Sequence, residues 1–550
     1  MNIEMISNEG LLFIRPPLPE LEKELQFWNI TPKVGHYEYV NRKTGDTVLG
    51  TSRKGYEKKQ ELLYSLSPDG VWMVTHDGMF RRVADVLNMA GIYTYTHHRV
   101  HPLPEFYFDA SVVAGLRPEQ IQAVIYSLAA SGCRQKGGAV PAPGSGGALI
   151  SSTMATGKTF WIAAMIRAFR DEKIVITTYR KAVVRRLYDG LNEILNPEGI
   201  EVGMVTGEVN REKQITVCTF GSLMNFDQDK TRVLIVDEVH RAAGEDISGV
   251  LLEFKRAVKF GCSGTIKGHI RERYLESIFG PIAFSFEDEE AEELDRVSKV
   301  KVYALSVPKG PPATAKREDI LERHCITRNK VRNRLIRDTA ALVPEDMQLI
   351  IFVRTIEHID LLVNGVVFES DPEHPEVPVK DPIPPYLPPG YEIYHGQLPP
   401  KEKRRIEEGL YSGEIKRLIA NDSLSEGVDT TKLRVMIDAN WWSSDCSVSQ
   451  KGGRNRRKDE GKYLGIIINF QDEWCDILRK KRLEELRQLG MQPSEEEQKA
   501  DFLKGKADKR LTQYRKRGWP VLRIDSPDKI NFNEINQPEI QQTELPMDEG

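Results

Sequence analysis

Short apolar runs alternate with helix-like stretches twice along this chain of 550 residues. The first series occupies 148–150, 174–177, 215–219, 233–236 and 258–262, and the second occupies 349–353, 391–394, 417–420, 433–437 and 463–470. Runs of this kind are too apolar to face water on either side, which is typical of parallel strands covered by helices on both faces. The pattern predicts two α/β domains in tandem.

The segments around these two series set the predicted domain boundaries. Residues 1–105 alternate β-like and helical runs, which indicates a small α+β domain. The boundaries we predict are 1–105 for this accessory domain, 106–300 and 346–475 for the two α/β domains, 301–345 for a helical linker, and 476–550 for a basic helical extension and a disordered tail. Residues 369–389 carry many prolines and predict an irregular insertion.

Gly157-Lys158-Thr159 lies between an apolar run and a helical run, as a phosphate-binding loop requires. In such a loop the backbone N–H groups and the helix N-terminus hold phosphates, the lysine reaches the β- and γ-phosphates, and the threonine hydroxyl binds Mg²⁺. A helix N-terminus with a chance lysine is the alternative. The nucleotide-binding residues that we predict here are Ser152, Thr153, Met154, Ala155, Thr156, Gly157, Lys158 and Thr159.

Two carboxylates follow the apolar run Val233–Val236, at Asp237 and Glu238. Parallel α/β sheets bind ligands at the carboxyl ends of their strands, so both side chains are expected to open into the ligand crevice. We predict that Asp237 holds Mg²⁺ and that Glu238 orients and deprotonates an attacking water. A pair of helix-capping acids is the alternative.

Asp237-Glu238-Val239-His240 resembles the motif of DEAD/DEAH-type helicases, and further motifs follow in the order found in superfamily 2 helicases and translocases. Ser263-Gly264-Thr265 resembles the motif that couples ATP to strand grip, and Leu116–Gln120 resembles the leader that reads adenine. This likeness nominates Arg117 and Gln120 for nucleotide binding. Ser152 and Ala155 are mild departures from the family pattern. The resemblance implies a fold of two tandem RecA-like parallel-sheet domains with the small N-terminal α+β domain.

The second α/β domain carries the matching later motifs. Gln450–Arg457 resembles the motif whose arginines reach the γ-phosphate, which nominates Arg454 and Arg457 as catalytic residues beside Lys158, Asp237 and Glu238. Ser425–Asp429 resembles the motif that binds both strand and nucleotide. The resemblance further nominates Gly427 and Asp429 for the nucleotide, and Thr219, Ser222, Arg354, His395 and Ser425 for the nucleic acid.

Within the superfamily the chain resembles the XPB-like branch and its phage UvsW-type recombination helicases. That likeness implies an enzyme that uses ATP and Mg²⁺ to remodel duplex or branched DNA in recombination, replication or repair. An ATPase sensor or scaffold that does not unwind, the motor of a restriction system and an RNA helicase are the alternatives. Trp441-Trp442 is expected either to stack on a base or to pack in a core, and His240 either to couple ATP to the DNA site or merely to donate a hydrogen bond.

Composition limits where the protein is expected to reside in the cell. No apolar run approaches the roughly 20 residues that cross a bilayer, and the first residues do not resemble a secretory signal. The six cysteines contain no Cys-x-x-Cys pair, so zinc and a disulfide framework are not expected. We therefore expect a cytoplasmic protein of a bacterium or a phage-infected host. The net charge of −4 does not point to nucleic acid by itself, although basic runs gather in the second half.

Overall fold

The computed structural model describes residues 3–40, 47–93, 95–139, 141–153, 156–264, 266, 271–307, 322–365, 383–424, 431–441, 452–472, 487–490 and 502–536. The chain divides into two compact units. The first contains residues 1–153 and 157–287, and the second contains residues 154–156 and 288–550. Each unit has its own sheets and its own hydrophobic core.

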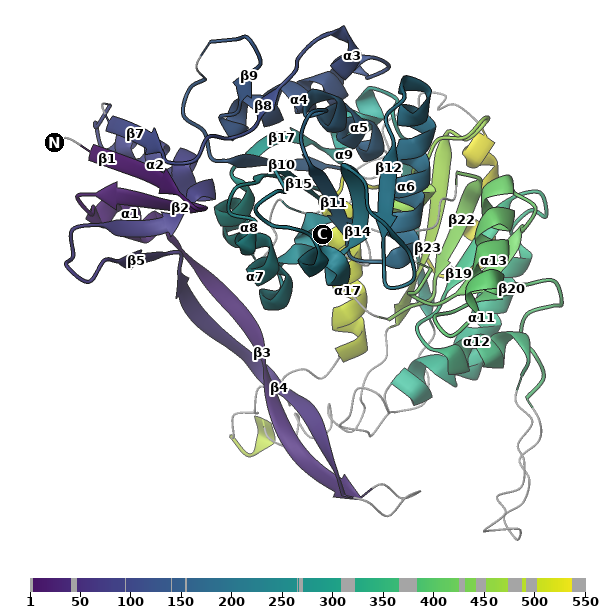
Figure 1. The fold of residues 1–550 in the computed structure, drawn as a ribbon. Helices are drawn as coiled ribbons and strands as arrows, with labels where there is room; N and C mark the ends of the chain where they lie inside the picture. Colours follow the sequence, from purple (N-terminus) through teal and green to yellow (C-terminus); the bar gives the residue numbers. More distant parts are fainter. Residues whose placement is uncertain are drawn as a thin grey trace. The chain divides into compact units, whose positions relative to one another are not determined.

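The first unit begins with a five-stranded mixed sheet and two helices (Figure 1). The strands in spatial order are β5 Tyr64–Leu66, β6 Met73–His76, β2 Leu11–Arg15, β1 Ile3–Asn8 and β7 Tyr95–Arg99, and the helices are α1 Pro19–Glu24 and α2 Phe80–Met89. Every second residue of β1 and β2 is buried, together with Phe80, Val83 and Leu87 of α2. Period-two burial on the strands and helical spacing on α2 put one apolar face of each element into a common core.

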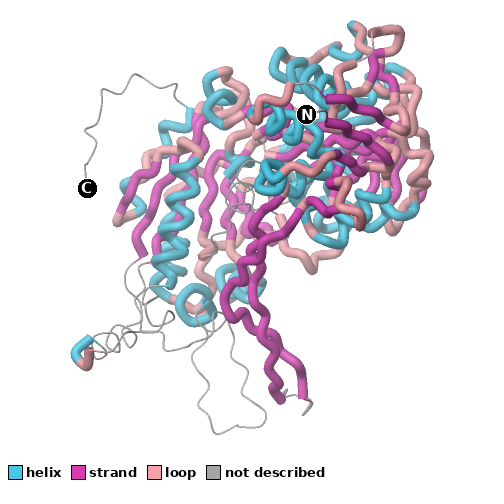
Figure 2. The backbone as a smooth tube through the Cα atoms, turned by 90° about the vertical axis from the view of Figure 1, so that its left-hand side faces the viewer, coloured by secondary structure: helices cyan, strands magenta, loops and turns pink. Residues whose placement is uncertain are grey.

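A long antiparallel ribbon leaves this small sheet. Its strands, β3 Gln26–Val40 and β4 Thr47–Leu62, pair with each other and with no other strand in the described part of the chain. The register runs from Gln26 opposite Leu62 to Val40 opposite Thr47 and shifts between Pro32 and Val34. Figures 1 and 2 both show this ribbon as a narrow two-stranded arm.

A buried polar cluster joins the small sheet to the rest of the first unit. The Asp77 carboxylate accepts hydrogen bonds from the Ser7 hydroxyl and from the Arg99 guanidinium, each at 2.5 Å. Arg99 also donates to the carbonyl oxygen of Gly144 at 3.0 Å. Gly144 lies three residues before the strand β10, so the cluster ties the N-terminal sheet to the approach of that strand. Asp77 is 6% exposed and its charge is compensated by Arg99, as burial of a carboxylate requires.

The larger sheet of the first unit has eight strands. Their spatial order is β13 Asn210–Arg211, β12 Val202–Val205, β14 Ile215–Thr219, β11 Ile174–Thr178, β15 Val233–Asp237, β16 Val258–Ser263, β10 Gly147–Ser152 and β17 Ile282–Phe286. All neighbours run parallel except β12 and β13. The helices are α3 Ala110–Val113, α4 Pro118–Ser131, α5 Lys158–Ala168, α6 Lys181–Leu195, α7 Glu245–Glu253 and α8 Glu272–Phe279, and two short strands, β8 Glu105–Phe106 and β9 Arg134–Gln135, pair beside them.

Burial on both faces explains the apolar runs of this sheet. Ala148 and Ile150 of β10 belong to one core with α5, whereas Leu149 between them belongs to a second core with Val239 and Leu251. Each of these residues is at most 3% exposed. Because the strands are parallel, the carboxyl ends of β10, β15 and β16 meet at one edge, where the predicted site residues follow them.

The second unit is built on a seven-stranded sheet in which all neighbouring strands are parallel. The spatial order is β20 Glu392–Tyr394, β21 Arg417–Ala420, β19 Gln348–Phe352, β22 Leu433–Asp438, β23 Leu464–Asp472, β18 Lys299–Val307 and β24 Val521–Ile524. The longer helices are α9 Asp288–Glu293, α11 Lys330–Ala341, α12 Ile356–Val363, α13 Pro400–Ser412 and α17 Phe502–Lys516. Two tandem parallel-sheet domains of the RecA-like type are thus confirmed, with all ten predicted strands at the expected places.

Two elements of the second sheet differ from the sequence-based boundaries. Residues 301–307 belong to β18, a central strand, and not to a helical linker. The C-terminal extension supplies the edge strand β24, and Phe532 and Ile535 beyond it are buried in the core, so the disordered tail does not begin near residue 525. Both were missed because β18 follows a charged stretch and the last apolar residues are sparse. The part of the tail at 537–550 and most of the insertion at 369–389 lie outside the described residues.

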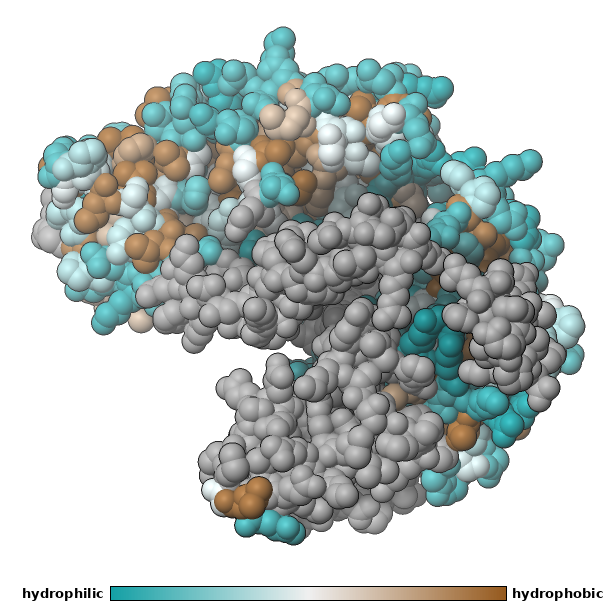
Figure 3. Space-filling model, turned by 90° about the horizontal axis from the view of Figure 1, so that it is seen from below, coloured by the Kyte–Doolittle hydropathy of each residue, from teal (hydrophilic) through white to brown (hydrophobic). Residues whose placement is uncertain are grey.

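The described surface is polar with scattered apolar residues. Figure 3 shows hydrophilic residues over much of the described part of one face, interrupted by separate apolar areas. Exposed apolar side chains such as Met89 and Tyr93 are 89% and 77% exposed. Within the described ranges, none of the helices combines the length and the apolar character that a membrane crossing needs.

His358 predicts a pH dependence of stability in the second unit. It lies buried in α12, its Nε2 is 2.9 Å from Asn333 Oδ1, and burial together with Arg332 lowers its pKa to about 3. The unfolded chain binds this proton near pH 6.5, so stability is lost as the pH falls below that value. Between pH 7 and pH 5 we expect a loss of about 2 kcal/mol from this group. Urea unfolding at both pH values should show a weaker pH dependence for His358→Gln; an unchanged dependence would contradict the assignment.

Candidate nucleotide-binding site

The phosphate loop connects β10 to α5. Ser152 ends β10 and is buried, and the Thr153 N–H donates to the carbonyl oxygen of Phe286 in the neighbouring strand at 3.1 Å. Thr156 is buried, whereas Met154 and Ala155 lie outside the described residues. Gly157 precedes α5 with φ of +85°, a left-handed conformation that favours glycine. The loop therefore leads directly into the N-terminus of an eleven-residue helix, where free backbone N–H groups can bind an anion.

Gln120 lies directly against this loop. Its Nε2 is 3.4 Å from the Gly157 carbonyl oxygen, and a Cβ on Gly157 would stand 2.6 Å from the same Nε2. The Gln120 Oε1 accepts a hydrogen bond from the Arg117 backbone N–H at 3.0 Å, which fixes the glutamine at the start of α4. Gln120 and Arg117, which the leader motif nominates, are thus brought to the phosphate loop, and their contact with a base stays a prediction.

Lys158 and Glu238 form an ion pair at the carboxyl edge of the sheet. The Lys158 Nζ is 3.2 Å from Glu238 Oε1, and the two side chains are only 17% and 18% exposed. Burial alone would lower the pKa of Lys158, but the carboxylates of Glu238 and Asp237 raise it above its ordinary value. Burial would likewise raise the pKa of Glu238, but Lys158 and His240 hold it below its ordinary value. Both groups are therefore charged at neutral pH.

The backbone of Glu238 is in the left-handed region, with φ of +51°. This conformation costs a non-glycine residue roughly 1–2 kcal/mol and turns the chain sharply at the end of β15. The side chain is held on its other side by the Ser263 hydroxyl, which donates to Glu238 Oε2 at 3.2 Å. Since that hydroxyl has one hydrogen, it accepts from His240 Nδ1 at 2.7 Å, and His240 carries its proton on Nδ1. The favourable contacts of Glu238 compensate the strained backbone.

Asp237 ends β15 beside this pair. Burial and the neighbouring Glu238 carboxylate raise its pKa, and Cys262 Sγ donates to its Oδ1 at 3.4 Å. A carboxylate whose ionised form is disfavoured in this way suits a cation, which would stabilise that form. Thr159, the second predicted Mg²⁺ ligand, is half-buried in the first turn of α5. Among the described side chains, no group of three or more His, Cys, Asp or Glu residues could hold a metal ion alone.

The predicted nucleic-acid residues of the first unit, Thr219 and Ser222, are both buried. Thr219 ends β14 and Ser222 follows in the next turn, and their hydroxyls lie 2.9 Å apart. They are 9% and 5% exposed. The two side chains therefore satisfy each other, and their contact with a nucleic acid stays a prediction.

The second unit contains Arg354 and His395 at the ends of strands. Arg354 donates to Glu322 at 3.0 Å, and its guanidinium lies over the Trp441 ring, 5.3 Å from the centroid. Trp441 is 1% exposed, so it packs in a core, which decides between the two roles considered for it. His395 is half-buried, and its Nδ1 accepts from the Gln397 backbone N–H at 3.3 Å. The remaining nominated residues, Ser425, Gly427 and Asp429, lie outside the described residues, as does Trp442.

Arg454 lies in a short helical segment of the second unit, and Arg457 follows just after its end. Arg454 is buried and Arg457 is half-buried, and the Arg457 N–H donates to the Arg454 carbonyl oxygen at 3.3 Å. The Arg457 carbonyl oxygen in turn accepts from Lys462 Nζ at 3.1 Å. The backbone of this segment is thus fixed, and the roles of the two guanidinium groups stay predictions.

Two protein-family matches cover the residues described above, one in each unit. Residues 114–268 match the family described as "Type III restriction enzyme, res subunit" (ResIII), and residues 334–459 match the family described as "Helicase conserved C-terminal domain". The chain is similar to these two families over the matched ranges. The first range contains the phosphate loop and Glu238, and the second contains Arg454 and Arg457.

Similar proteins include helicases of archaea and bacteria. The ATP-dependent DNA helicase Hel308 of Pyrococcus horikoshii is 24% identical over 382 residues, which are 60% of this chain and 50% of that protein. The uncharacterized ATP-dependent helicase YprA of Bacillus subtilis is 36% identical over 75 residues, 14% of this chain and 10% of YprA. The chain thus spans half or less of the length of these relatives. Among solved structures, the ATP-dependent Type ISP restriction-modification enzyme LlaBIII bound to DNA matches with a TM-score of 0.48 and 16% identity, over 76% of this chain and 32% of that one.

Arg456 is a charged residue of the C-terminal helicase domain that the sequence analysis did not single out. Its side chain is 1% exposed and pairs with the carboxylates of Asp288 and Glu292 in α9, the latter at 2.9 Å. The guanidinium also lies 5.8 Å from the centre of the Trp519 ring. The motif Gln450–Arg457 contains three arginines, and the sequence does not show which of them is buried. Only the tertiary structure shows that Arg456 anchors the segment to α9 and to the residues after α17.

Replacement of Arg456 should therefore destabilise the domain. Arg456→Ala leaves the Glu292 carboxylate without its buried partner and leaves Asp288 with Arg517 alone, so we expect a loss of about 1–3 kcal/mol. We expect a clearly lower urea midpoint for Arg456→Ala by circular dichroism. Arg457→Ala, one residue further on and half-buried, is the matched control and should change the midpoint little. Equal midpoints for both variants would show that the Arg456 cluster contributes nothing.

Proposed function

We propose that the protein is an ATP-dependent helicase or translocase that acts on DNA. The observation that carries this proposal is the cluster at the carboxyl edge of the first large sheet, where Lys158 pairs with Glu238 and a left-handed Gly157 opens α5. A buried lysine beside a helix N-terminus is a site for an anion, and two adjacent carboxylates beside it suit a divalent cation. A nucleoside triphosphate with Mg²⁺ satisfies both.

The residues of the first unit fit ATP and Mg²⁺ in defined roles. The loop from Ser152 to Thr159 would hold the phosphates, with Lys158 exchanging its bond to Glu238 for the β- and γ-phosphates. The Thr159 hydroxyl and the Asp237 carboxylate would hold Mg²⁺. ATP supplies the phosphoanhydride bond whose hydrolysis releases the free energy. Release of Lys158 frees the Glu238 carboxylate, which Ser263 still orients, to accept a proton from water.

The second domain supplies positive charge for the transition state in this proposal. Arg454 and Arg457 would act on the γ-phosphate, and such arginines contribute about 10³–10⁵ in rate in related phosphoryl-transfer enzymes. Nucleotide-dependent closure and opening of the two domains would then change their grip on a nucleic-acid backbone. Lys462 and Arg456 would hold this segment in place through the contacts described above.

The proposed substrate is duplex or branched DNA in recombination, replication or repair, by analogy with the XPB-like branch and the UvsW-type helicases. The relative Hel308 is named a DNA helicase, which supports DNA. An ATPase that senses nucleic acid without unwinding, a restriction motor and an RNA helicase are the other candidates. ATPase rates with single-stranded DNA, duplex DNA, forked DNA and RNA, together with strand displacement on the fork, separate these functions. ATP turnover without displacement would favour the sensor.

Lys158→Ala should remove ATP turnover. The variant loses the cation for the phosphates and leaves Glu238 with a raised pKa, so we expect at least about a 100-fold lower kcat. Phosphate release at saturating DNA is the measurement. Lys173→Ala, which removes a partly exposed lysine of the same unit, is the control and should retain turnover. Near-normal turnover in Lys158→Ala would refute the phosphate-loop assignment.

Glu238→Gln should separate binding from hydrolysis. Glutamine has the shape of glutamate and can still accept from Ser263, but it cannot accept a proton from water at neutral pH. We expect retained binding of a fluorescent ATP analogue with about a 100-fold or greater loss of turnover. Glu253→Gln, at the end of α7, is the matched control. Loss of nucleotide binding in Glu238→Gln would argue against a role as the base.

A further inference from the structure

In the described part of the chain, the ribbon of β3 and β4 is a sheet of two strands, so each strand has one edge that pairs with no other strand. Fourteen register pairs at ~3.3 Å per residue give a length of roughly 45 Å. An isolated two-stranded ribbon is marginally stable in water, because neither face is covered. An arm of this length therefore gains stability from a partner that it meets.

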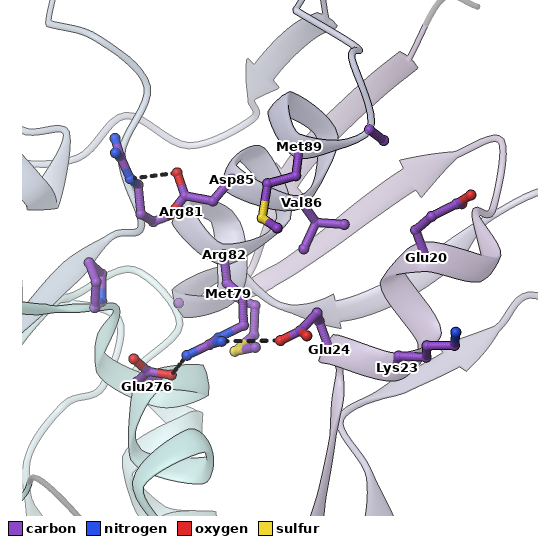
Figure 4. Close-up of a pocket in the computed structure, with 13 residues that line it drawn as sticks. Glu20, Lys23, Glu24, Met79, Arg81, Arg82, Asp85, Val86, Met89 and Glu276 are labelled. Atoms are coloured by element: carbon purple, nitrogen blue, oxygen red, sulfur yellow. Dashed lines mark hydrogen bonds and ion pairs between the residues drawn. The ribbon is translucent and has the colours of Figure 1, made fainter.

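The root of the ribbon is fixed to α8 of the first unit (Figure 4). Arg82 of α2 donates to Glu24 at 3.3 Å and to Glu276 of α8 at 2.6 Å, which the close-up shows as two dashed lines. Arg273, also of α8, donates to the carbonyl oxygen of Gln26, the first residue of β3, at 2.8 Å. Beside these residues lies a cavity of about 510 Å³ lined by α1, α2 and Glu276.

Close backbone packing makes this root stiff. A Cβ on Gly78 would lie 2.4 Å from the Glu276 carbonyl oxygen and 2.5 Å from that of Ser277, so the turn Asp77–Met79 packs flush against α8. The ribbon is closed at its base by the Leu63 N–H, which donates to the Leu25 carbonyl oxygen at 2.8 Å. These contacts hold the base of the ribbon against α8, and α8 follows β16 and Ser263 in the chain.

The ribbon differs from the rest of the chain in charge. Residues 26–62 contain seven Lys or Arg and four Asp or Glu, a net charge of +3, whereas the whole chain carries −4. The register places Lys59 opposite Asn29, Lys58 opposite Ile30 and Arg53 opposite Val34 along β4. A basic segment on an acidic protein is the charge distribution expected of a contact with a polyanion.

We propose that the β3–β4 ribbon is an arm that enters the major groove of duplex DNA. The major groove of B-form DNA, about 12 Å wide, admits a two-stranded β-ribbon. One helical turn is ~34 Å long, so the arm spans more than a turn. The inference rests on the proposed action on DNA and names the element that holds the duplex. Lysines on free edges also oppose pairing between two ribbons, which keeps the arm available for DNA.

A shortened arm tests the proposal in the full chain. Replacing residues 30–58 by Asn-Gly joins Asn29 to Lys59, which lie opposite each other, through a favoured two-residue turn. Basal ATPase activity without DNA should be unchanged, which shows that the ATPase domains still fold. Affinity for a 30-base-pair DNA duplex, measured by fluorescence anisotropy, should fall at least tenfold. Affinity for duplex RNA should change little, because its major groove is too narrow for a ribbon.

A charge variant tests the arm without shortening it. R53Q/K54Q/K58Q/K59Q removes four positive charges from β4, and it should lower the slope of log K against log salt by roughly 2–4, since each phosphate contact contributes about 0.9. The matched control K136Q/R170Q/K213Q/K255Q removes four positive charges from the surface of the first unit, where each residue pairs with an exposed carboxylate. The control should leave the slope and the duplex affinity unchanged.

The outcomes separate this inference from the proposed function. Wild-type protein that binds no nucleic acid would refute both. Wild-type binding that the shortened arm retains in full would refute the arm alone, as would equal losses in the two charge variants. Light scattering gives a further check: a wild-type dimer that becomes a monomer when the arm is shortened would assign the ribbon to a second copy of the chain and overturn the proposal.

Discussion

The ion pair between Lys158 and Glu238 places one cation and two carboxylates in a largely buried site at the carboxyl edge of a parallel sheet. Charges in such a place are costly unless they are paired, and here each neighbour compensates another. Asp237 is left with a raised pKa, and Glu238 accepts a left-handed backbone in order to reach both Lys158 and Ser263. The surrounding strands are apolar on both faces because a hydrophobic core covers each face of the sheet.

Polar contacts attach the N-terminal sheet and the arginine-bearing segment to the elements beside them. The N-terminal sheet is joined to the approach of β10 through Asp77 and Arg99, and to α8 through Arg82 and Glu276. Whatever the N-terminal domain binds is therefore connected to the strands that carry the phosphate loop and Ser263. In the second unit, Arg456 and α9 give the arginine-bearing segment a comparable support. Both attachments are made by ion pairs and hydrogen bonds, whose directional contacts fix where the attached segment lies.

The chemistry of the first site could be predicted because it is local. Lys158 follows its strand by six residues and Asp237 ends its own, so the parallel topology alone brings them to one edge. Gln120 lies against the same loop, and its contact with a base stays a prediction. The support of that site could not be predicted in the same way. Ser263 belongs to a motif that the sequence shows, but its contact with Glu238, 25 residues away, does not follow from that motif. Arg456 is 168 residues from Asp288, and nothing in the sequence marks that pair.

The two parallel-sheet domains, the phosphate loop and the acidic strand end can be predicted from the amino-acid sequence, because burial on both faces and strand-end chemistry leave patterns within a few residues. Tertiary structure alone decided that 301–307 and the C-terminal extension complete the second sheet, that Trp441 is core, and that Arg456 is an anchor. These outcomes depend on which distant segments meet. Whether a charged or aromatic side chain is buried depends on which distant segments pack around it, and the type of residue does not decide it.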